Sequence, residues 1–208
     1  MTKHKYSSLP LLPLPGCGNY NVYTTMRGVT QSQADDPYAG FNVCHYTGDT
    51  PAHVAECRSN LAQAFGTDVA HLIIPRQTHS TSVLSITDTL PTPEELKGVD
   101  GIVTTRRDII IGVSTADCVP LIMIDPVGGV TAAVHAGWRG ALGGIATEAL
   151  RAMKQLGAQP ARITAVMGPS ICRDCFEVGE EVAGLFPPTC VRTVGYDKPH
   201  VSLQTYIT

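Results

Sequence analysis

The segment PLIMIDPVGGVTAAVH, residues 120–135, contains two apolar runs separated by a turn. The runs Pro120–Asp125 and Val130–His135 have the length and the residue types of buried strands. The proline and the two glycines between them are typical of a tight turn. We therefore expect two neighbouring antiparallel strands, and a purely parallel, doubly wound sheet is not expected.

Other strand-like and helical segments surround this pair. Five further runs have the composition of strands: His71–Ile74, Ser82–Ile86, Gly101–Thr105, Ile109–Ser114 and Ile163–Met167. A helix is predicted from a cap at Thr50, with proline in its first position, to Gly66. A second helix is predicted to follow Trp138 and to stop at Gly157. The predicted fold is α+β, with mixed β-sheets covered by helices in a single domain, residues 1–208.

The composition excludes several classes of protein. A hydrophobic share of 43% and a charged share of 16% in 208 residues indicate a packed globule and not a disordered or coiled-coil chain. The net charge is −3 and no basic run occurs, so we expect no nucleic-acid partner. The apolar runs are too short to span a membrane, and prolines interrupt the N-terminal one, so a cytoplasmic protein is expected. The oligomeric state stays open.

The seven cysteines indicate reduced thiols, because an odd number in a chain of this size does not suggest a disulfide framework. Cys172 and Cys175 form a CxxC motif, which is typical of redox exchange or of half a zinc site. No second CxxC occurs in the sequence. We therefore interpret the pair as taking no part in the chemistry.

Ligand-type side chains lie at the ends of three predicted strands. The segment QTH ends at His79, ADC ends at Cys118, and HAGWRG begins at His135. A sheet holds such side chains rigidly while they face its rim. Two imidazoles and one thiolate suit zinc, and three protein ligands leave a fourth position open, as in catalytic zinc sites. The sequence therefore predicts a catalytic zinc, which would activate a water or polarise a substrate oxygen.

Three alternatives use the same residues. Cys118 could be a nucleophile activated by a histidine without metal, as in a Cys-His hydrolase. A copper-binding oxidoreductase would add a weak methionine ligand such as Met123, but no histidine lies between Cys118 and Met123, so any copper is expected to be adventitious. A purely structural metal would need a fourth protein ligand, and the sequence suggests none.

A candidate anion site lies beside these residues. The segment Gly137–Gly140, which opens the second predicted helix, would present backbone amides to an anion such as phosphate.

Four motifs in this order resemble the YfiH-type laccase-domain family: DGIVTT (residues 100–105), ADCVPL (116–121), HAGWRG (135–140) and GPSICRDCFEVGEEV (168–182). That family is also described as zinc-dependent purine nucleoside phosphorylases, formerly as multicopper polyphenol oxidases. The resemblance implies an α/β/β/α sandwich with zinc on His79, Cys118 and His135. It also implies phosphorolysis of adenosine, inosine and S-methyl-5'-thioadenosine to free base and (methylthio)ribose 1-phosphate, with adenosine deamination as a side activity. Multicopper oxidation is not expected, since the chain has only seven histidines.

The resemblance also implies roles for four polar residues. Arg58 and Arg139 are expected to contact phosphate, and Arg27 and Asn42 to contact the nucleoside. The alternative for Arg27 and Arg58 is an ordinary surface ion pair. The family's chain usually continues beyond the position of Ser202 with a helix and a segment bearing cysteine and arginine, which this 208-residue sequence is expected to lack.

Overall fold

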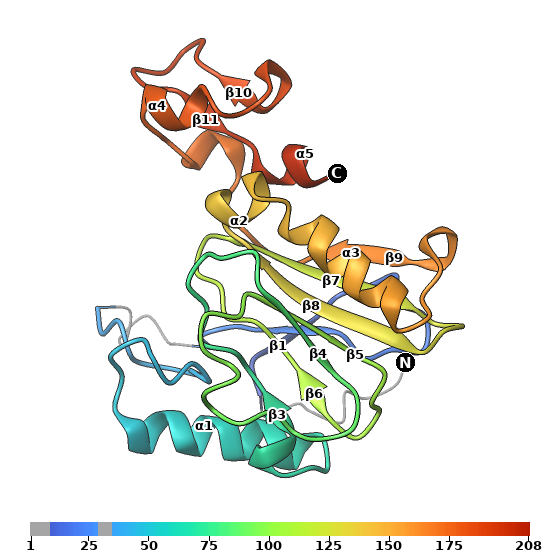
Figure 1. Ribbon diagram of the computed structural model, residues 1–208. Helices are drawn as coiled ribbons and strands as arrows, with labels where there is room; N and C mark the ends of the chain where they lie inside the picture. Colours follow the sequence, from blue (N-terminus) through green and yellow to red (C-terminus); the bar gives the residue numbers. More distant parts are fainter. Residues whose placement is uncertain (1–8, 29–34) are drawn as a thin grey trace.

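A mixed five-stranded sheet forms the centre of the computed structural model, which describes residues 9–28 and 35–208 (Figure 1). Its strands in spatial order are β4 (Val83–Ile86), β5 (Gly101–Thr104), β8 (Val130–Ala136), β7 (Val119–Asp125) and β9 (Thr164–Met167). β4 and β5 are parallel, and the other neighbouring pairs are antiparallel. The β7–β8 hairpin confirms the interpretation of residues 120–135.

The buried carboxylate of Asp125 closes the turn between β7 and β8. Its Oδ1 accepts hydrogen bonds from the backbone N–H groups of Val127 at 3.0 Å and Gly128 at 2.9 Å. Its Oδ2 accepts from the backbone N–H of Gln159 at 2.8 Å and from Arg162 Nη2 at 2.8 Å. The bond to Arg162, and then the backbone donors, hold the pKa of Asp125 well below its usual range. One ionised side chain thus joins the hairpin to the segment that leads into β9.

Replacing Asp125 with asparagine is expected to lower the free energy of unfolding at neutral pH. The amide loses the charge that faces Arg162 and turns an N–H donor toward backbone donors. A carboxyl with a lowered folded-state pKa stabilises the fold above its unfolded pKa of about 4, and this contribution is lost as the pH falls toward the folded pKa. The difference between the two proteins in urea unfolding should therefore shrink between neutral pH and about pH 3. A difference independent of pH would contradict this role.

One face of the large sheet is covered by α3 (Ile145–Gln155), as Figure 1 shows. The buried face of this helix, which includes Ile145, Ala149 and Met153, packs in one cluster with Val103 of β5 and Val134 of β8. Side chains alternate across a strand, so the residue before Val103 must face the opposite side of the sheet.

The predicted helix after Trp138 is two helices, α2 (Trp138–Leu142) and α3, so the prediction of one continuous helix was wrong. Gly144 has a φ of 84°, in the left-handed region that interrupts a helix. A Cβ on Gly143 would lie 2.6 Å from Thr81 Cγ2, so the interruption also packs tightly against a neighbouring loop. Glycine pairs can break a helix as well as end it, and here the break separates α2, which follows β8 directly, from the helix on the sheet.

The opposite face of the sheet is covered by small β elements and then by α1 (Pro51–Ala64), which begins at its predicted cap, Thr50. β3 (Leu72–Ile73) and β6 (Ile110–Ile111) form a parallel pair, and β1 (Leu11–Pro13) and β2 (Tyr23–Thr25) an antiparallel pair. Ile73 packs with Ile102 of the large sheet, whereas Leu72 packs with Leu61 of α1. The layers therefore run α3, large sheet, small sheet, α1, which is the predicted α/β/β/α order (Figure 1).

Each of the seven predicted strand segments contains a strand. β4, β5 and β9 are one residue shorter than predicted, and β3 and β6 are much shorter. β3 and β6 pair over two residues each. Further along both segments, the backbone of Ser114 bonds the side chain of Gln77 and not the backbone of another strand.

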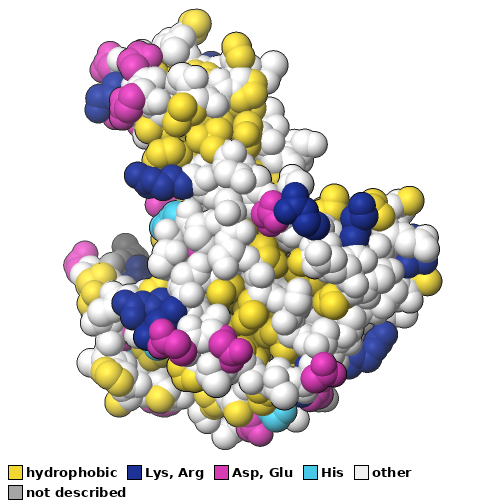
Figure 2. Space-filling model, viewed as in Figure 1, with side chains coloured by type: hydrophobic (Ala, Val, Ile, Leu, Met, Phe, Trp, Pro, Cys, Tyr) yellow, Lys and Arg dark blue, Asp and Glu magenta, His cyan; other side chains and the backbone are white. Residues whose placement is uncertain are grey.

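The C-terminal elements were not predicted from the sequence. They are α4 (Glu180–Ala183), β10 (Val191–Arg192), β11 (His200–Val201) and α5 (Leu203–Ile207), and the chain also has 3-10 helices at η2 (Val69–His71), η3 (Pro160–Arg162), η4 (Arg173–Cys175) and η5 (Pro188–Cys190). The C-terminal part, from α4 to α5, projects from the sheet in Figure 1, and Figure 2 shows hydrophobic side chains exposed on it. Phe186 and Leu203 join it to the main core. Among the described residues, no helix has the length and apolar character needed to cross a bilayer.

Candidate metal centre

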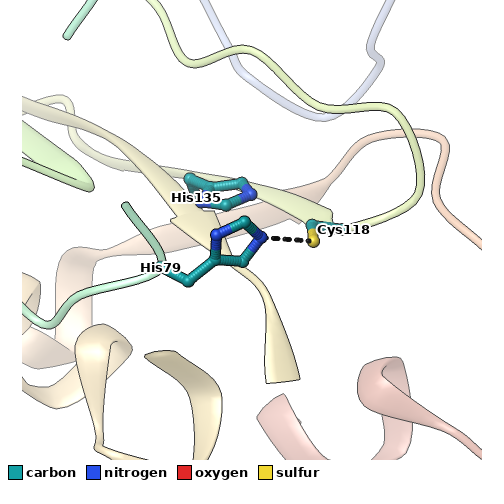
Figure 3. Close-up of side chains that lie close together, drawn as sticks. All are labelled: His79, Cys118 and His135. Carbon is teal, nitrogen blue, oxygen red and sulfur yellow. Dashed lines mark hydrogen bonds between the residues drawn. The ribbon is translucent and has the colours of Figure 1, made fainter. Parts of the chain in front are cut away.

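The side chains of His79, Cys118 and His135 meet at one end of the β7–β8 hairpin (Figure 3). His135 lies near the end of β8, and Cys118 directly precedes β7, where the antiparallel register pairs Val119 with Ala136. His79 reaches the same point from the loop between β3 and β4. The three potential ligand atoms all lie within 4.8 Å of one another, with Cys118 Sγ 3.8 Å from His79 Nε2. Over residues 9–28 and 35–208, no other three His, Cys, Asp or Glu residues form such a group.

The fully buried carboxylate of Asp100 orients both histidines. Its Oδ1 accepts from His135 Nδ1 at 2.7 Å and from the backbone N–H of His79 at 3.0 Å. Its Oδ2 accepts from the backbone N–H groups of Thr78 and Ser80, each at 2.9 Å, and from the hydroxyl of Ser80 at 2.9 Å. The Nδ1 atom of His135 is thus engaged, which leaves Nε2 for a metal. A carboxylate behind a histidine ligand is the usual way in which proteins fix its ring and tautomer.

Asp100, which bonds both candidate histidine ligands, was not among the site residues predicted from the sequence, although it opens the DGIVTT motif. Its only signal in the sequence was a charged residue directly before the wholly buried strand Gly101–Thr104. A charge at that position is ordinarily on the surface, and here it is 0% exposed.

The side chains in the cluster shift one another's pKa values. Burial would raise the pKa of Asp100, but its hydrogen bonds, led by the one from His135, lower it to about 2. Burial would lower the pKa of His135, but the bonds to Asp100 and Cys118 raise it to about 9. The pKa of His79 is lowered by burial and then by the charge of His135. A metal held by both histidines would have to displace a proton from His135, whose pKa is raised, more than from His79, whose pKa is lowered.

The backbone holds His79 in a strained conformation. With a φ of 61°, it is the one non-glycine residue in the left-handed region in the described part of the chain. Such a residue costs on the order of 1–3 kcal/mol and persists only where its surroundings hold it. Besides Asp100, the preceding Gln77 fixes this loop, since its side chain donates to Ser114 O at 2.7 Å and accepts from Ser114 N at 2.7 Å. Hydrogen bonds within the protein therefore hold the loop that carries the His79 imidazole.

Gly137 leaves the space that the cluster occupies. A Cβ at this position would lie 2.6 Å from His79 Cδ2 and 3.0 Å from Cys118 Sγ. A Cβ on Gly140 would similarly lie 3.0 Å from the carbonyl oxygen of Ser80. These glycines allow α2 to approach the loop that carries His79 closely. Binding of an anion by their backbone amides stays a prediction.

Replacing Gly137 with alanine is expected to weaken zinc binding about tenfold or more, because the new methyl group displaces two ligands. Gly112→Ala is the matched control, since its Cβ would meet only Ile74 Cγ1, at 3.8 Å. Competition with a chromophoric chelator measures both affinities. Equal zinc affinity in Gly137→Ala and the unaltered protein would show that the ligands do not need this space.

A cavity of about 1010 Å³ lies beside the cluster, and all three candidate ligands line it. Its wall includes the side chains of β7 and β8 that face away from α3, such as Ile122, Ile124 and Thr131. Pockets of this size accommodate organic ligands and not only ions or water. The cluster can therefore act on a molecule bound in this cavity.

Arg27 and Asn42 also line this cavity. Arg27 Nη2 donates to the carbonyl oxygens of Asp36 at 2.6 Å and Ala39 at 3.4 Å. Asn42 Nδ2 donates to Asp49 Oδ2 at 2.9 Å. Both side chains therefore have hydrogen-bond partners among residues 36–49.

Arg58 and Arg139 are not among the residues that line the cavity. Arg58 is committed to two carbonyl oxygens, donating to Val43 at 3.1 Å and Leu72 at 2.9 Å, and burial lowers its pKa. Its hydrogen bonds thus go to backbone and not to a surface carboxylate. Arg139 is exposed, stacks on Trp138 at 4.1 Å and is close enough to contribute to the lowered pKa of His79. Arg139 thus lies near enough to the candidate ligands to influence His79, and Arg58 is held by backbone contacts.

Comparisons with known proteins converge on one group. The sequence model of the family described as multi-copper polyphenol oxidoreductase laccase matches residues 21–207. "Adenosine deaminase RL5", from an unknown prokaryotic organism, is 42% identical over 196 residues, which are 88% of this chain and 74% of that protein. "Purine nucleoside phosphorylase ORF3" from Streptomyces griseus is 38% identical over 185 residues, 87% of this chain and 74% of that protein. The crystal structure of the Bacillus licheniformis hypothetical protein YfiH superposes with a TM-score of 0.84 at 25% identity, covering 96% of this chain and 79% of that one.

Proposed function

The chain belongs to the multi-copper polyphenol oxidoreductase laccase family, and from that premise we propose that it is a zinc-dependent purine nucleoside phosphorylase. Its proposed substrates are adenosine, inosine and S-methyl-5'-thioadenosine, with adenosine deamination as a side activity. The observation that carries the proposal is the group of three ligand atoms within 4.8 Å on the wall of a cavity of about 1010 Å³. The names of the relatives, a phosphorylase and a deaminase, support the choice of reaction.

We favour zinc over copper for this donor set. Two imidazole nitrogens and one thiolate suit zinc, and Asp100 supplies the partner that a histidine ligand of zinc usually has. Zinc held by His79, Cys118 and His135 would supply Lewis acidity and, with three protein ligands, an open position. Multicopper oxidation needs several copper sites, and the described residues contain one three-ligand group. We treat copper as an adventitious occupant.

The chain's own residues would bind and orient the two substrates. Arg27 and Asn42 are proposed to contact the nucleoside, which is supported by their place in the cavity wall. Arg139 is proposed to contact phosphate, supported by its electrostatic effect on His79. The same proposal for Arg58 rests on the family resemblance, because its guanidinium already bonds two carbonyl oxygens. In deamination, the cavity would hold the purine ring beside the ligand cluster.

A metal-free cysteine hydrolase is the second candidate, and one observation favours it. Asp100 bonds His135 Nδ1 at 2.7 Å, and the other side of that imidazole faces the cluster that contains Cys118. Carboxylate, imidazole and thiol therefore follow one another as they do in cysteine hydrolases. The two candidates differ in what they require: the phosphorylase needs zinc and phosphate, and the hydrolase needs neither.

Chromatography of the products formed from each nucleoside tests the proposal, with and without phosphate, on protein of defined zinc and copper content. We expect free base and sugar phosphate only when phosphate is present, and some inosine from adenosine through deamination. Base release without phosphate that survives a chelator would favour the hydrolase. An absence of product from all three nucleosides with zinc-loaded protein would contradict the proposed function.

Arg58→Ala and Arg139→Ala are each expected to raise the KM for phosphate about tenfold or more, the loss expected for one charge-assisted hydrogen bond. Zinc content should stay unchanged. Arg151→Ala is the control, since this exposed arginine of α3 pairs with Glu148. Initial rates at varied phosphate measure the effect. An unchanged KM for phosphate in either variant would remove that arginine from the phosphate site.

A further inference from the structure

Two exposed cysteines lie side by side outside the metal centre. Cys172 and Cys175 are both exposed, and their Sγ atoms are 3.3 Å apart, within hydrogen-bond distance. Of the other five cysteines, four are buried and the fifth, Cys118, belongs to the metal centre. This pair is therefore the part of the thiol content that reagents in solution can reach together.

The backbone between the two thiols is a closed turn. The 3-10 helix η4 spans Arg173–Cys175, and the N–H of Cys175 donates to the carbonyl oxygen of Cys172 at 3.1 Å. Residues related by such a turn have Cα atoms within about 7 Å, close to the separation of about 4.4–6.8 Å that disulfides span. Side-chain rotation can therefore join the two sulfurs without moving the fold.

We propose that Cys172 and Cys175 are a thiol–disulfide exchange site that takes a small-molecule disulfide of the glutathione type as its oxidant. The Cys172 thiolate attacks one sulfur of the disulfide, whose S–S bond breaks and releases one thiolate, which takes up a proton. Cys175 then gives up its proton and attacks Cys172 Sγ in the mixed disulfide, releasing the second thiol. The two protein thiols are oxidised to one intrachain disulfide, and one small-molecule disulfide is reduced to two thiols.

The surroundings distinguish the attacking thiol from the resolving one. The Cys175 thiol and then the backbone N–H groups of Cys175 and Asp174 lower the pKa of Cys172, and the hydrogen bond to Cys172 raises that of Cys175. Cys172 is thus the better nucleophile, as in other CxxC motifs. Arg192 Nη1 lies 3.4 Å from Asp174 Oδ1, and Arg173 Nε lies 3.8 Å from it, so two guanidinium groups offset the one carboxylate beside the pair.

The pair is not assembled as a metal site, because no third His, Cys, Asp or Glu donor joins it in the described part of the chain. It lies next to the metal loop nevertheless: the N–H of Ile171 donates to the carbonyl oxygen of Asp117 at 2.8 Å. Cys172 directly follows Ile171, and Cys118 directly follows Asp117. A test must therefore distinguish reaction at the exchange pair from reaction at the thiol of Cys118.

The test equilibrates the zinc-loaded protein, in which Cys118 is protected, with glutathione buffers from fully reduced to fully oxidised. Acid quenching, alkylation and peptide mass mapping then locate every thiol and disulfide. We expect an intrachain Cys172–Cys175 disulfide that reduced glutathione reverses. Cys175→Ser should stop at one glutathione adduct on residue 172, and Cys172→Ser should react at least about tenfold more slowly at residue 175. Circular dichroism checks that both variants fold.

Three outcomes would overturn the proposal. Both thiols could stay free across the whole series of buffers. Glutathione could remain on both cysteines without an intrachain bond. Alternatively, zinc titration of the reduced protein could reveal a second tightly bound equivalent that Cys172→Ser abolishes, which would make the pair a metal site.

Discussion

Replacing Cys118 with alanine is expected to reduce bound zinc from about one equivalent per chain to a trace and to abolish phosphate-dependent base release. Cys118 is one of the three candidate ligands and offers the only soft donor atom in the cluster. Two histidines alone would hold zinc far more weakly, because each lost ligand also leaves the ion exposed to competing water. Elemental analysis of dialysed protein measures the zinc, and chromatography measures the base.

The fold itself should survive this substitution. Cys118 is only partly buried and precedes β7 instead of contributing to its core face. Cys175→Ala is the matched control, because it removes an exposed thiol that is not a candidate ligand. Full zinc content in Cys118→Ala, with its circular dichroism unchanged, would rule out the proposed ligand set.

Replacing Asp100 with asparagine is expected to weaken zinc binding by about 10–100-fold, the range found when the partner of a histidine ligand is removed. One carboxylate receives His135 Nδ1 and three backbone N–H groups, those of residues 78–80. An amide cannot accept all of these bonds and turns its own N–H donors toward other donors. The His79 loop, strained at a φ of 61°, should then relax and misplace its ligand.

Asp125→Asn provides a matched control for this second prediction. Asp125 is an equally buried carboxylate, lies at the opposite end of β7 and bonds Arg162 and backbone donors. Both variants should unfold at lower urea concentration, but only Asp100→Asn should lose zinc affinity in competition with a chelator. Equal zinc affinity in the two variants would show that Asp100 contributes stability and not metal positioning.

The local signals in the sequence were sufficient for the β7–β8 hairpin, for the start of α1 and for the choice of three residues that the structure brings together. The β7–β8 hairpin follows from apolar runs and turn residues that are adjacent in the chain, and Thr50 caps α1 through its own neighbours. Once the hairpin is known, Cys118 and His135 must meet, since they lie at the same end of paired strands.

The remaining features depend on contacts between distant segments, which spacing does not reveal. Asp100 is recognisable only when residues 78–80 and His135 converge on it. The break at Gly144 arises from a conformation that the helical periodicity does not record. The hydrogen bonds that Arg58 makes to the carbonyl oxygens of Val43 and Leu72, which lie 15 and 14 residues away in the sequence, were likewise not foreseen, and its contact with phosphate stays a prediction.

We propose that the centre formed by His79, Cys118 and His135 carries phosphate-dependent cleavage of purine nucleosides. The most direct test follows adenine release from adenosine by one preparation at saturating phosphate, first with zinc bound, then after chelation, and again after zinc is restored. We predict that release requires phosphate, stops when zinc is removed and returns in proportion to the zinc rebound. Adenine release that continues unchanged in the zinc-free protein would contradict the account.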